Sequence, residues 1–213
     1  MRPRRVPTAT LERMATYLRL TADLMANGVT MISSSDVEEA TGVSAAQFRK
    51  DLSYFGEFGT PGVGYPVTEL RQRLAAIMNT DREHPVIMAG AGNLGRAVAM
   101  YEALPEQGFK IVAVFDKDPR RIGSPVGGVL VQPAARLGEI TRQLKARIGL
   151  IAVPAEAAQD VAAQMVDAGI IGILNFAPVS LKVPSNVMVR NVSLRRELAL
   201  IAYHLSLGEE PAS

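Results

Sequence analysis

Residues 86–97 read VIMAGAGNLGRA, an apolar run that leads directly into a glycine-rich turn. The turn has the pattern G-x-G-x-x-G, which follows a predicted strand and opens a predicted helix. In this pattern the first glycine permits a tight turn, the second lets a pyrophosphate approach the backbone, and the third lets the helix pack closely on the strand. The stretch therefore predicts a βα unit that holds the phosphates of a dinucleotide near the helix N-terminus. The candidate residues of this turn are Gly90, Ala91, Gly92, Asn93, Leu94 and Gly95.

An acidic residue follows the glycine turn at the spacing that a dinucleotide site requires. The next predicted strand ends at Asp116, which lies 21 residues after Gly95. A carboxylate at this place accepts hydrogen bonds from the ribose hydroxyls of NAD and repels the 2′-phosphate of NADP. The basic residues Lys117, Arg120 and Arg121 follow and favour NADP, but Asp116 is nearest to the ribose. We therefore expect the cofactor to be NADH or NAD.

Beyond residue 85, apolar runs of strand length alternate with helical patterns. Nearly continuous apolar strands are typical of a parallel sheet that is covered on both faces. The runs lie at residues 86–90, 111–115, 129–131, 148–153, 170–175 and 187–190. They predict an α/β fold in which a doubly wound parallel sheet, a Rossmann domain, occupies residues 81–192.

The first 80 residues follow a helical pattern instead. Apolar residues from Leu11 to Ala22 recur at spacings of three and four, which predicts a helix over residues 10–26. Capping boxes at Ser35–Glu38 and Ser44–Gln47 predict two short helices, and a further helix is predicted over residues 67–78. A glycine-rich segment at residues 56–65 separates the last two. This order indicates a winged helix-turn-helix domain over residues 1–80.

The third predicted helix would be the recognition helix of such a domain. Gln47 and Arg49 offer paired hydrogen bonds to bases, and Lys50 offers a charge to a phosphate or a guanine. The alternative is a solvated Arg–Lys pair on an ordinary helix. Arginines 2, 4 and 5 would add phosphate contacts. The candidate DNA-binding residues are Ser44, Gln47, Arg49, Lys50, Ser53 and Tyr54 of the helix, and Thr60, Pro61, Gly62 and Gly64 of the glycine-rich wing.

Composition excludes several classes of protein. The chain has 213 residues, no cysteine, no tryptophan and a net charge of +2. Disulfides and thiolate metal sites are thereby excluded, and the absence of cysteine fits a reducing cytoplasm. No apolar run approaches the length of about 18 residues that a membrane span needs, so we expect no membrane partner. We find no Y-x-x-x-K pair or other catalytic motif, and we expect neither a catalytic nor a metal site.

Two other functional classes stay open on the residues alone. One is an NAD(P)-dependent oxidoreductase with an N-terminal helical appendage. The other is a CoA-binding Rossmann module, because the same glycine turn can hold the phosphates of CoA. Asp116 opposes the CoA reading, since a carboxylate would repel the 3′-phosphate of that ligand.

Longer strings in the sequence resemble one known family. The string AQFRKDLSYFGEFGTPGVGY (residues 46–65), the glycine turn and the string ILNFAP (residues 173–178) resemble the Rex family of redox-sensing transcriptional repressors. The resemblance implies a homodimer that binds palindromic operator DNA when NADH is scarce and releases it when NADH rises. It also implies that the C-terminal segment, residues 193–213, is exchanged between subunits. The further cofactor-binding residues that it implies are Tyr101, Val153, Pro154, Asn175, Phe176, Ala177 and Leu194.

One departure from the family pattern concerns the switch. Relatives often carry an acidic residue just before the exchanged helix, where this chain has Ser193. In the family that acid pairs alternately with the arginine matching Arg19 and the tyrosine matching Tyr101. We therefore expect this chain to distinguish NADH from NAD mainly through the apolar fit of Leu194 and Phe176 against the uncharged ring.

Overall fold

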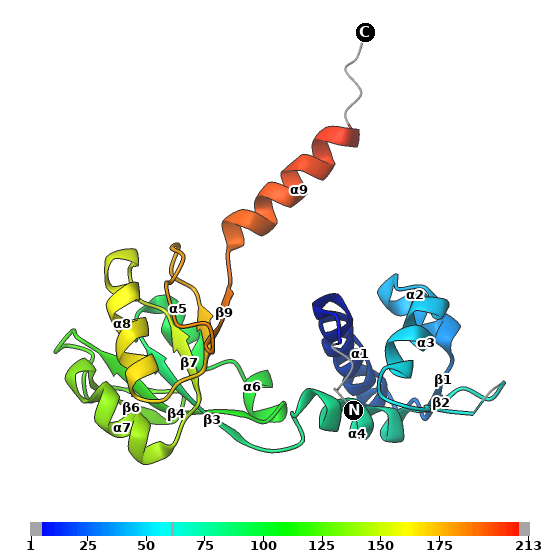
Figure 1. The fold of residues 1–213 in the computed structure, drawn as a ribbon, viewed down its shortest axis with the longest axis horizontal. Helices are drawn as coiled ribbons and strands as arrows, with labels where there is room; N and C mark the ends of the chain where they lie inside the picture. The colour runs from blue at the N-terminus through cyan, green and yellow to red at the C-terminus, as the bar shows by residue number, and fades with distance from the viewer. Residues whose placement is uncertain (1–5, 61, 209–213) are drawn as a thin grey trace, which may run out of the picture. The chain divides into compact units, whose positions relative to one another are not determined.

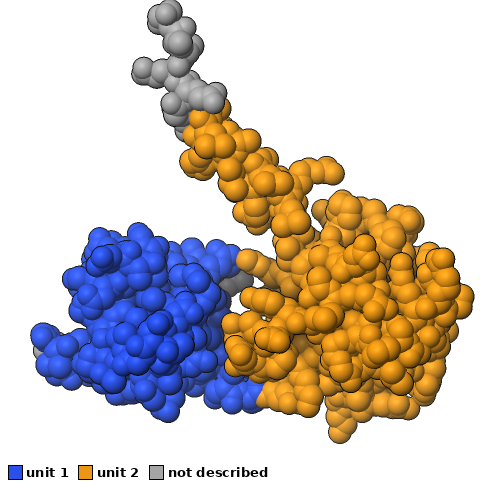
Figure 2. All heavy atoms as spheres, turned by 180° about the vertical axis from the view of Figure 1, so that it is seen from behind, with its two compact units in different colours: residues 1–82 blue, residues 83–213 orange. Residues whose placement is uncertain are grey.

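The computed structural model describes residues 6–60 and 62–208, and it divides the chain into two compact units (Figures 1 and 2). Unit 1 comprises residues 1–82 and unit 2 comprises residues 83–213. The division lies two residues past the end of the N-terminal domain that the sequence predicts. Pro61 and the arginines at positions 2, 4 and 5 lie outside the described residues.

Unit 1 is a helical domain with a small antiparallel sheet, as the sequence predicts. Its helices are α1 (Thr8–Ala26), α2 (Ser34–Thr41), α3 (Ala45–Ser53) and α4 (Val67–Met78). Strand β1 (Met31–Ile32) pairs with β2 (Tyr65–Pro66), which closes the glycine-rich segment into a wing. The core between the helices contains Met14, Phe48, Leu52 and Leu74. The winged helix-turn-helix prediction is confirmed.

The helix predicted over residues 10–26 is present as α1, and Leu11 lies outside its buried face at 38% exposure. The buried residues of α1 are Thr10, Met14, Tyr17, Leu18 and Thr21. The register predicted for α2 was wrong.

The capping box of α2 is Ser33 with Asp36, and not Ser35 with Glu38. Both registers fit the serine run, but Asp36 accepts from the Ser33 amide at 2.8 Å, whereas Glu38 accepts from the Ala45 amide at the start of α3 at 2.9 Å.

Unit 2 is an α/β domain with a seven-stranded sheet. The strands are β3 (His84–Ala89), β4 (Phe109–Asp116), β5 (Pro125–Val126), β6 (Val129–Pro133), β7 (Ile148–Ile151), β8 (Gly172–Asn175) and β9 (Met188–Asn191). Their order is β5-β6-β4-β3-β7-β8-β9, and all neighbours are parallel except β5 and β6. Without β5, this is the 3-2-1-4-5-6 order of a Rossmann fold. The prediction of a doubly wound parallel sheet is confirmed.

Helices cover both faces of this sheet, because successive strand residues alternate between two cores. In β3, Ile87 and Ala89 face one core, while Val86 and Met88 face the other. The helices of unit 2 are α5 (Asn93–Ala99), α6 (Ala103–Glu106), α7 (Leu137–Leu144), α8 (Ala155–Asp167) and α9 (Leu194–Gly208), with a 3-10 turn at Ala134–Arg136. Helices α7 and α8 line the first core, and α5 and α6 line the second.

Helix α9 differs from the other helices of unit 2. Between residues 194 and 206 every described side chain is exposed, although many of them are apolar. Among the described residues, no helix is both long enough and apolar enough to cross a membrane.

Candidate functional site

A cavity of about 850 Å³ opens at the carboxyl ends of β3, β4 and β7 in unit 2. Strands β4 and β7 flank β3 on opposite sides, so this is the point where the strand order reverses. Ligands of open α/β sheets bind at such switch points, and the volume lies in the range of small-molecule sites. Eight predicted cofactor residues line the cavity: Gly90, Gly92, Asn93, Leu94, Asp116, Val153, Pro154 and Phe176.

Glycine is present at the three positions of the motif for different structural reasons. Gly90 has a φ of +103°, and an added Cβ would lie 2.3 Å from the carbonyl oxygen of Ala152. A Cβ on Gly95 would lie 2.0 Å from the carbonyl oxygen of Gly90. Gly92 has an ordinary φ of −71°, and apart from its chain neighbours an added Cβ would meet only Arg121 Nη1, at 3.8 Å. The fold therefore requires glycine at 90 and 95, whereas glycine at 92 keeps space free in the cavity.

Asp116 lies at one end of the cavity and is held by three donors. Its Oδ2 accepts hydrogen bonds from the Ala91 amide at 2.7 Å and from Arg121 Nη1 at 3.1 Å, and its Oδ1 accepts from the Asp118 amide at 2.8 Å. Burial acts to raise the pKa of Asp116, but these hydrogen bonds outweigh it and lower the pKa below its usual value. Asp116 is therefore an ionised acceptor whose orientation is set before a ligand arrives.

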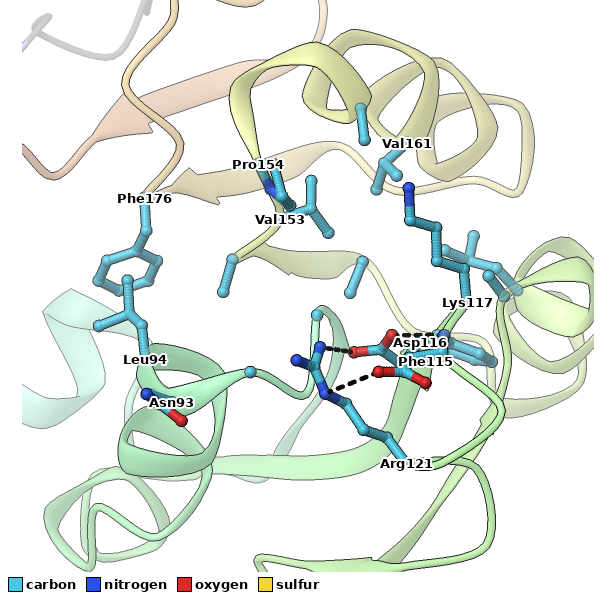
Figure 3. A pocket seen from close by; sticks show the side chains of 18 of the residues that line it. Asn93, Leu94, Phe115, Asp116, Lys117, Arg121, Val153, Pro154, Val161 and Phe176 are labelled. Atoms are coloured by element: carbon cyan, nitrogen blue, oxygen red, sulfur yellow. Dashed lines mark hydrogen bonds and ion pairs between the residues drawn. The ribbon is translucent and has the colours of Figure 1, made fainter.

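The two ends of the cavity differ in character (Figure 3). Leu94 and Phe176 lie together at one end, while Asp116, Lys117 and Val161 lie toward the other. An apolar end suits an uncharged ring, and a polar end suits a sugar. Gln164 and Asp118 also line the cavity. Neither residue was predicted from the sequence, because α8 and the loop after β4 carry no motif that marks them.

Six predicted cofactor residues do not line the cavity. Ala91 and Gly95 belong to the glycine turn but are buried. Asn175 and Ala177 are buried too, and the Asn175 side chain donates to Ala177 O at 3.2 Å and to Val179 O at 2.8 Å. These contacts shape the turn that carries Phe176.

Tyr101 and Leu194 are exposed, 63% and 74%, and the single chain does not bring them to the cavity. Within residues 6–60 and 62–208, no group of three or more His, Cys, Asp or Glu side chains is placed to hold a metal ion.

In unit 1, helix α3 presents a polar surface. Arg49, Lys50 and Ser53 are exposed, and Arg49 Nη1 donates to Ser34 Oγ of α2 at 2.6 Å. Ser44 caps the helix, because its Oγ accepts from the Gln47 amide at 3.2 Å. The Gln47 side chain does not return to the cap as the predicted box requires; it donates to Asp51 at 2.8 Å.

The wing is a tight turn next to this surface. Thr60 and Gly64 exchange backbone hydrogen bonds of 3.1 Å, and Val63 at the tip is 66% exposed. Gly64 has a φ of +105°, and an added Cβ would lie 2.7 Å from the carbonyl oxygen of Ile32. A groove of about 650 Å³ runs between the wing and α3, lined by Arg49, Ser53 and Thr60 among others.

Two protein families match parts of the chain. The family described as "Putative DNA-binding protein N-terminus" matches residues 5–53. The family described as "CoA binding domain" matches residues 81–179. The two matches fall in different units and fit a DNA-binding domain followed by a nucleotide-binding one.

Relatives that cover the whole chain identify the family more closely. A redox-sensing transcriptional repressor named Rex from Pelotomaculum thermopropionicum is 46% identical over 212 residues, with 100% of both chains covered. The Rex repressor of Streptomyces coelicolor is 42% identical over 100% of this chain and 83% of its own length.

Two crystal structures of the Rex-family repressor RSP are similar over almost the whole chain. The complex with beta-NAD+ and operator DNA has a TM-score of 0.88 at 37% identity, covering 97% of this chain and 99% of that one. The complex with beta-NADH has a TM-score of 0.87 at 36% identity, covering 96% of both. The relatives are repressors, as predicted, and not oxidoreductases. The chain therefore belongs to the Rex family of redox-sensing transcriptional repressors.

Proposed function

We propose that this chain binds NADH or NAD in the cavity of unit 2, binds operator DNA through unit 1, and leaves the DNA when NADH is bound. Gly92 carries the nucleotide part of the proposal. The protein fold does not need glycine there, so the free space beside its backbone is explained by a ligand that comes close, as a pyrophosphate does. Asp116 would accept hydrogen bonds from the ribose hydroxyls, and Leu94 and Phe176 would contact the nicotinamide.

The surface of α3 and the wing supports the DNA part. Arg49, Lys50 and Ser53 would enter the major groove, and the backbone around Gly62 and Gly64 would lie against the neighbouring minor groove. Ser44, Tyr54 and Thr60 would add contacts at the ends of these elements. The crystallised relative RSP holds operator DNA, which favours the same use here. A repressor that reads DNA and NADH would work in the cytoplasm.

We further propose that α9 packs on a second copy of the chain. Leu194, Leu198, Ile201 and Leu205 recur at spacings of three and four and are 74%, 65%, 55% and 66% exposed. An apolar stripe of this kind needs a partner surface. If α9 is exchanged in a homodimer, Leu194 would reach the partner's cavity, and a palindromic operator would match the twofold symmetry.

The switch then depends on how differently the two ligands favour the released state. NADH supplies an uncharged dihydronicotinamide, whereas NAD has a cationic ring. Moving a two-state equilibrium from 1:99 to 99:1 needs about 5.5 kcal/mol of differential affinity, about half from each of two pockets. Phe176 and Leu94 offer an apolar surface that favours the uncharged ring.

A DNA titration tests this function. Wild-type protein would first select a duplex from a pool of randomised DNA, and binding to that duplex would be followed by fluorescence anisotropy. We expect NADH to release the duplex at concentrations at which NAD leaves it bound. Equal behaviour of the two ligands would contradict the proposal.

A further inference from the structure

Helix α3 contains a fully buried carboxylate, Asp51, at 0% exposure. Five hydrogen bonds hold its two oxygens, and most of the donors lie on α1. The donors are Thr10 Oγ1 at 3.1 Å, Arg13 Nη2 at 2.7 Å and Gln47 Nε2 at 2.8 Å to Oδ1, and Arg13 Nε at 2.6 Å and Tyr17 OH at 2.9 Å to Oδ2. We call Asp51 and its four donor residues, Thr10, Arg13, Tyr17 and Gln47, the Asp51 cluster.

In the Asp51 cluster, the charge of the carboxylate is balanced by Arg13, and both of its oxygens accept hydrogen bonds. A buried carboxylate costs free energy unless it is paired and hydrogen-bonded, and Arg13 here pairs with it through two nitrogens. Burial acts to raise the pKa of Asp51, but the hydrogen bonds from Arg13, Gln47, Tyr17 and Thr10 lower it. Burial and the bond to Asp51 raise the pKa of Tyr17, which therefore stays a neutral donor.

The geometry of α3 separates this cluster from the exposed face. Gln47 and Asp51 are four residues apart and so share one side of the helix, toward α1. At about 100° per residue, Arg49 is turned by about 200° from Gln47, and Ser53 by about 240°. Arg49 and Ser53 are exposed, while Gln47 is only half-exposed.

Aromatic contacts next to the Asp51 cluster also hold α3 in place. Tyr17 of α1 meets Phe48 edge to face at a centroid distance of 4.8 Å, and Phe48 meets Tyr65 at 5.2 Å. Tyr65 belongs to β2, next to the wing. Helix α3 is thus attached to α1 by one charged cluster and to the wing strand by one aromatic row.

We infer that Asp51 is a positioning residue for DNA recognition, which fixes α3 on α1 and retains Gln47 as an internal donor that reads no base. This inference rests on the proposed function, in which α3 is the recognition helix. It replaces the expectation that Gln47 contacts a base. Arg49 and the exposed side chains beside it are then the residues of α3 that read bases.

The test compares base preferences across variants of the full-length protein. Gln47→Met keeps the side-chain length and removes the donor, and Gln72→Met on the exposed side of α4 is its matched control. Each variant would be used to select from the same pool of randomised duplex DNA, and affinities for the enriched duplexes would be measured. We expect Gln47→Met to lower the affinity for all of them by one common factor of about threefold to tenfold, with the base preferences of wild type retained. Gln72→Met should match wild type.

A double-mutant cycle adds a readout that a general loss of stability would not give. If Gln47 acts through Asp51, then in Asp51→Asn the further change Gln47→Met should cost much less than it does in wild type. Where Asp51→Asn does not fold, the base preferences of Gln47→Met decide alone.

Relaxed preference at one symmetric pair of positions in Gln47→Met would overturn the inference, because Gln47 would then read a base. Affinity and preferences equal to those of wild type would overturn it as well. A wild-type protein that enriches no sequence would instead overturn the proposed function, and the inference with it.

Discussion

The two units build their binding surfaces from different parts of the chain. In unit 2 the cavity is shaped by backbone, because Gly90 turns the chain, Gly95 admits the helix and Gly92 leaves space. In unit 1 the exposed face of α3 is set by side chains, since the Asp51 cluster and Phe48 fix the helix on its neighbours.

This difference explains why one site was easier to predict than the other. A backbone-shaped site leaves a fixed glycine pattern in the sequence, whereas a site held by side chains is spread over α1 and α3. It also means that the two activities can be damaged separately.

The largest effect is expected at Gly92. Gly92→Ala places a methyl group where the pyrophosphate would lie, and overpacking of this kind costs roughly 1–3 kcal/mol. NADH affinity measured by calorimetry should fall by about 10- to 100-fold, while affinity for DNA without ligand stays at the wild-type value. Gly172→Ala in β8 is the control, because its added Cβ has no contact closer than 3.9 Å. Unchanged NADH affinity in Gly92→Ala would show that the nucleotide lies elsewhere.

The matching change in unit 1 is Arg49→Ala. If Arg49 makes a paired contact with a base, its loss should cost about 1–3 kcal/mol of DNA affinity and relax preference at one operator position. Lys50→Ala serves as comparison, since loss of a phosphate contact weakens all sequences alike and flattens the salt dependence by about one unit. NADH affinity should not change in either variant. Unaltered base preference in Arg49→Ala would show that Arg49 reads no base.

A smaller effect is expected from Asp116→Asn. The variant keeps one acceptor for the surrounding amides and removes the charge, which frees Arg121 to meet a 2′-phosphate. NADH affinity should fall by about tenfold or less. The ratio of NADH affinity to NADPH affinity should fall by a larger factor, because NADPH gains the contact with Arg121. Asp160→Asn on the exposed side of α8 is the control. A constant ratio would contradict the role of Asp116 at the ribose.

The smallest effect concerns Ser193. Its Oγ accepts from the Arg196 amide at 3.3 Å and so caps α9, a role that aspartate fills equally well. Ser193→Asp should strengthen NAD binding and operator binding by severalfold, through attraction to the cationic ring and to Arg19. Dissociation constants for both ligands and for the selected duplex would be compared with wild type. No change in any of them would place residue 193 outside the switch.

The sequence predicted much of this molecule because its strong patterns are local. The helix over residues 67–78 has the predicted bounds, and the apolar runs beyond residue 85 form strands of the seven-stranded sheet. Strand β5 and helix α6 were missed, because two and four residues carry too little periodicity to be recognised.

The predictions were wrong where tertiary contacts determine the local structure. Glu38 accepts from the Ala45 amide of α3 and so does not cap α2, and the Gln47 side chain donates to the Asp51 carboxylate one turn along α3. The cofactor roles of Tyr101 and Leu194 stay predictions, because both residues are exposed in the single chain and Leu194 would reach a cavity only through the proposed exchange of α9.

In the proposed function, a ligand in unit 2 controls DNA that unit 1 holds. The direct measurement is the release of a selected duplex as NADH is added to wild type and to Gly92→Ala under the same conditions. We predict that both proteins bind the duplex equally without ligand, and that the variant needs at least about tenfold more NADH for half-release. If the two release curves coincide, the cavity of unit 2 does not control DNA binding.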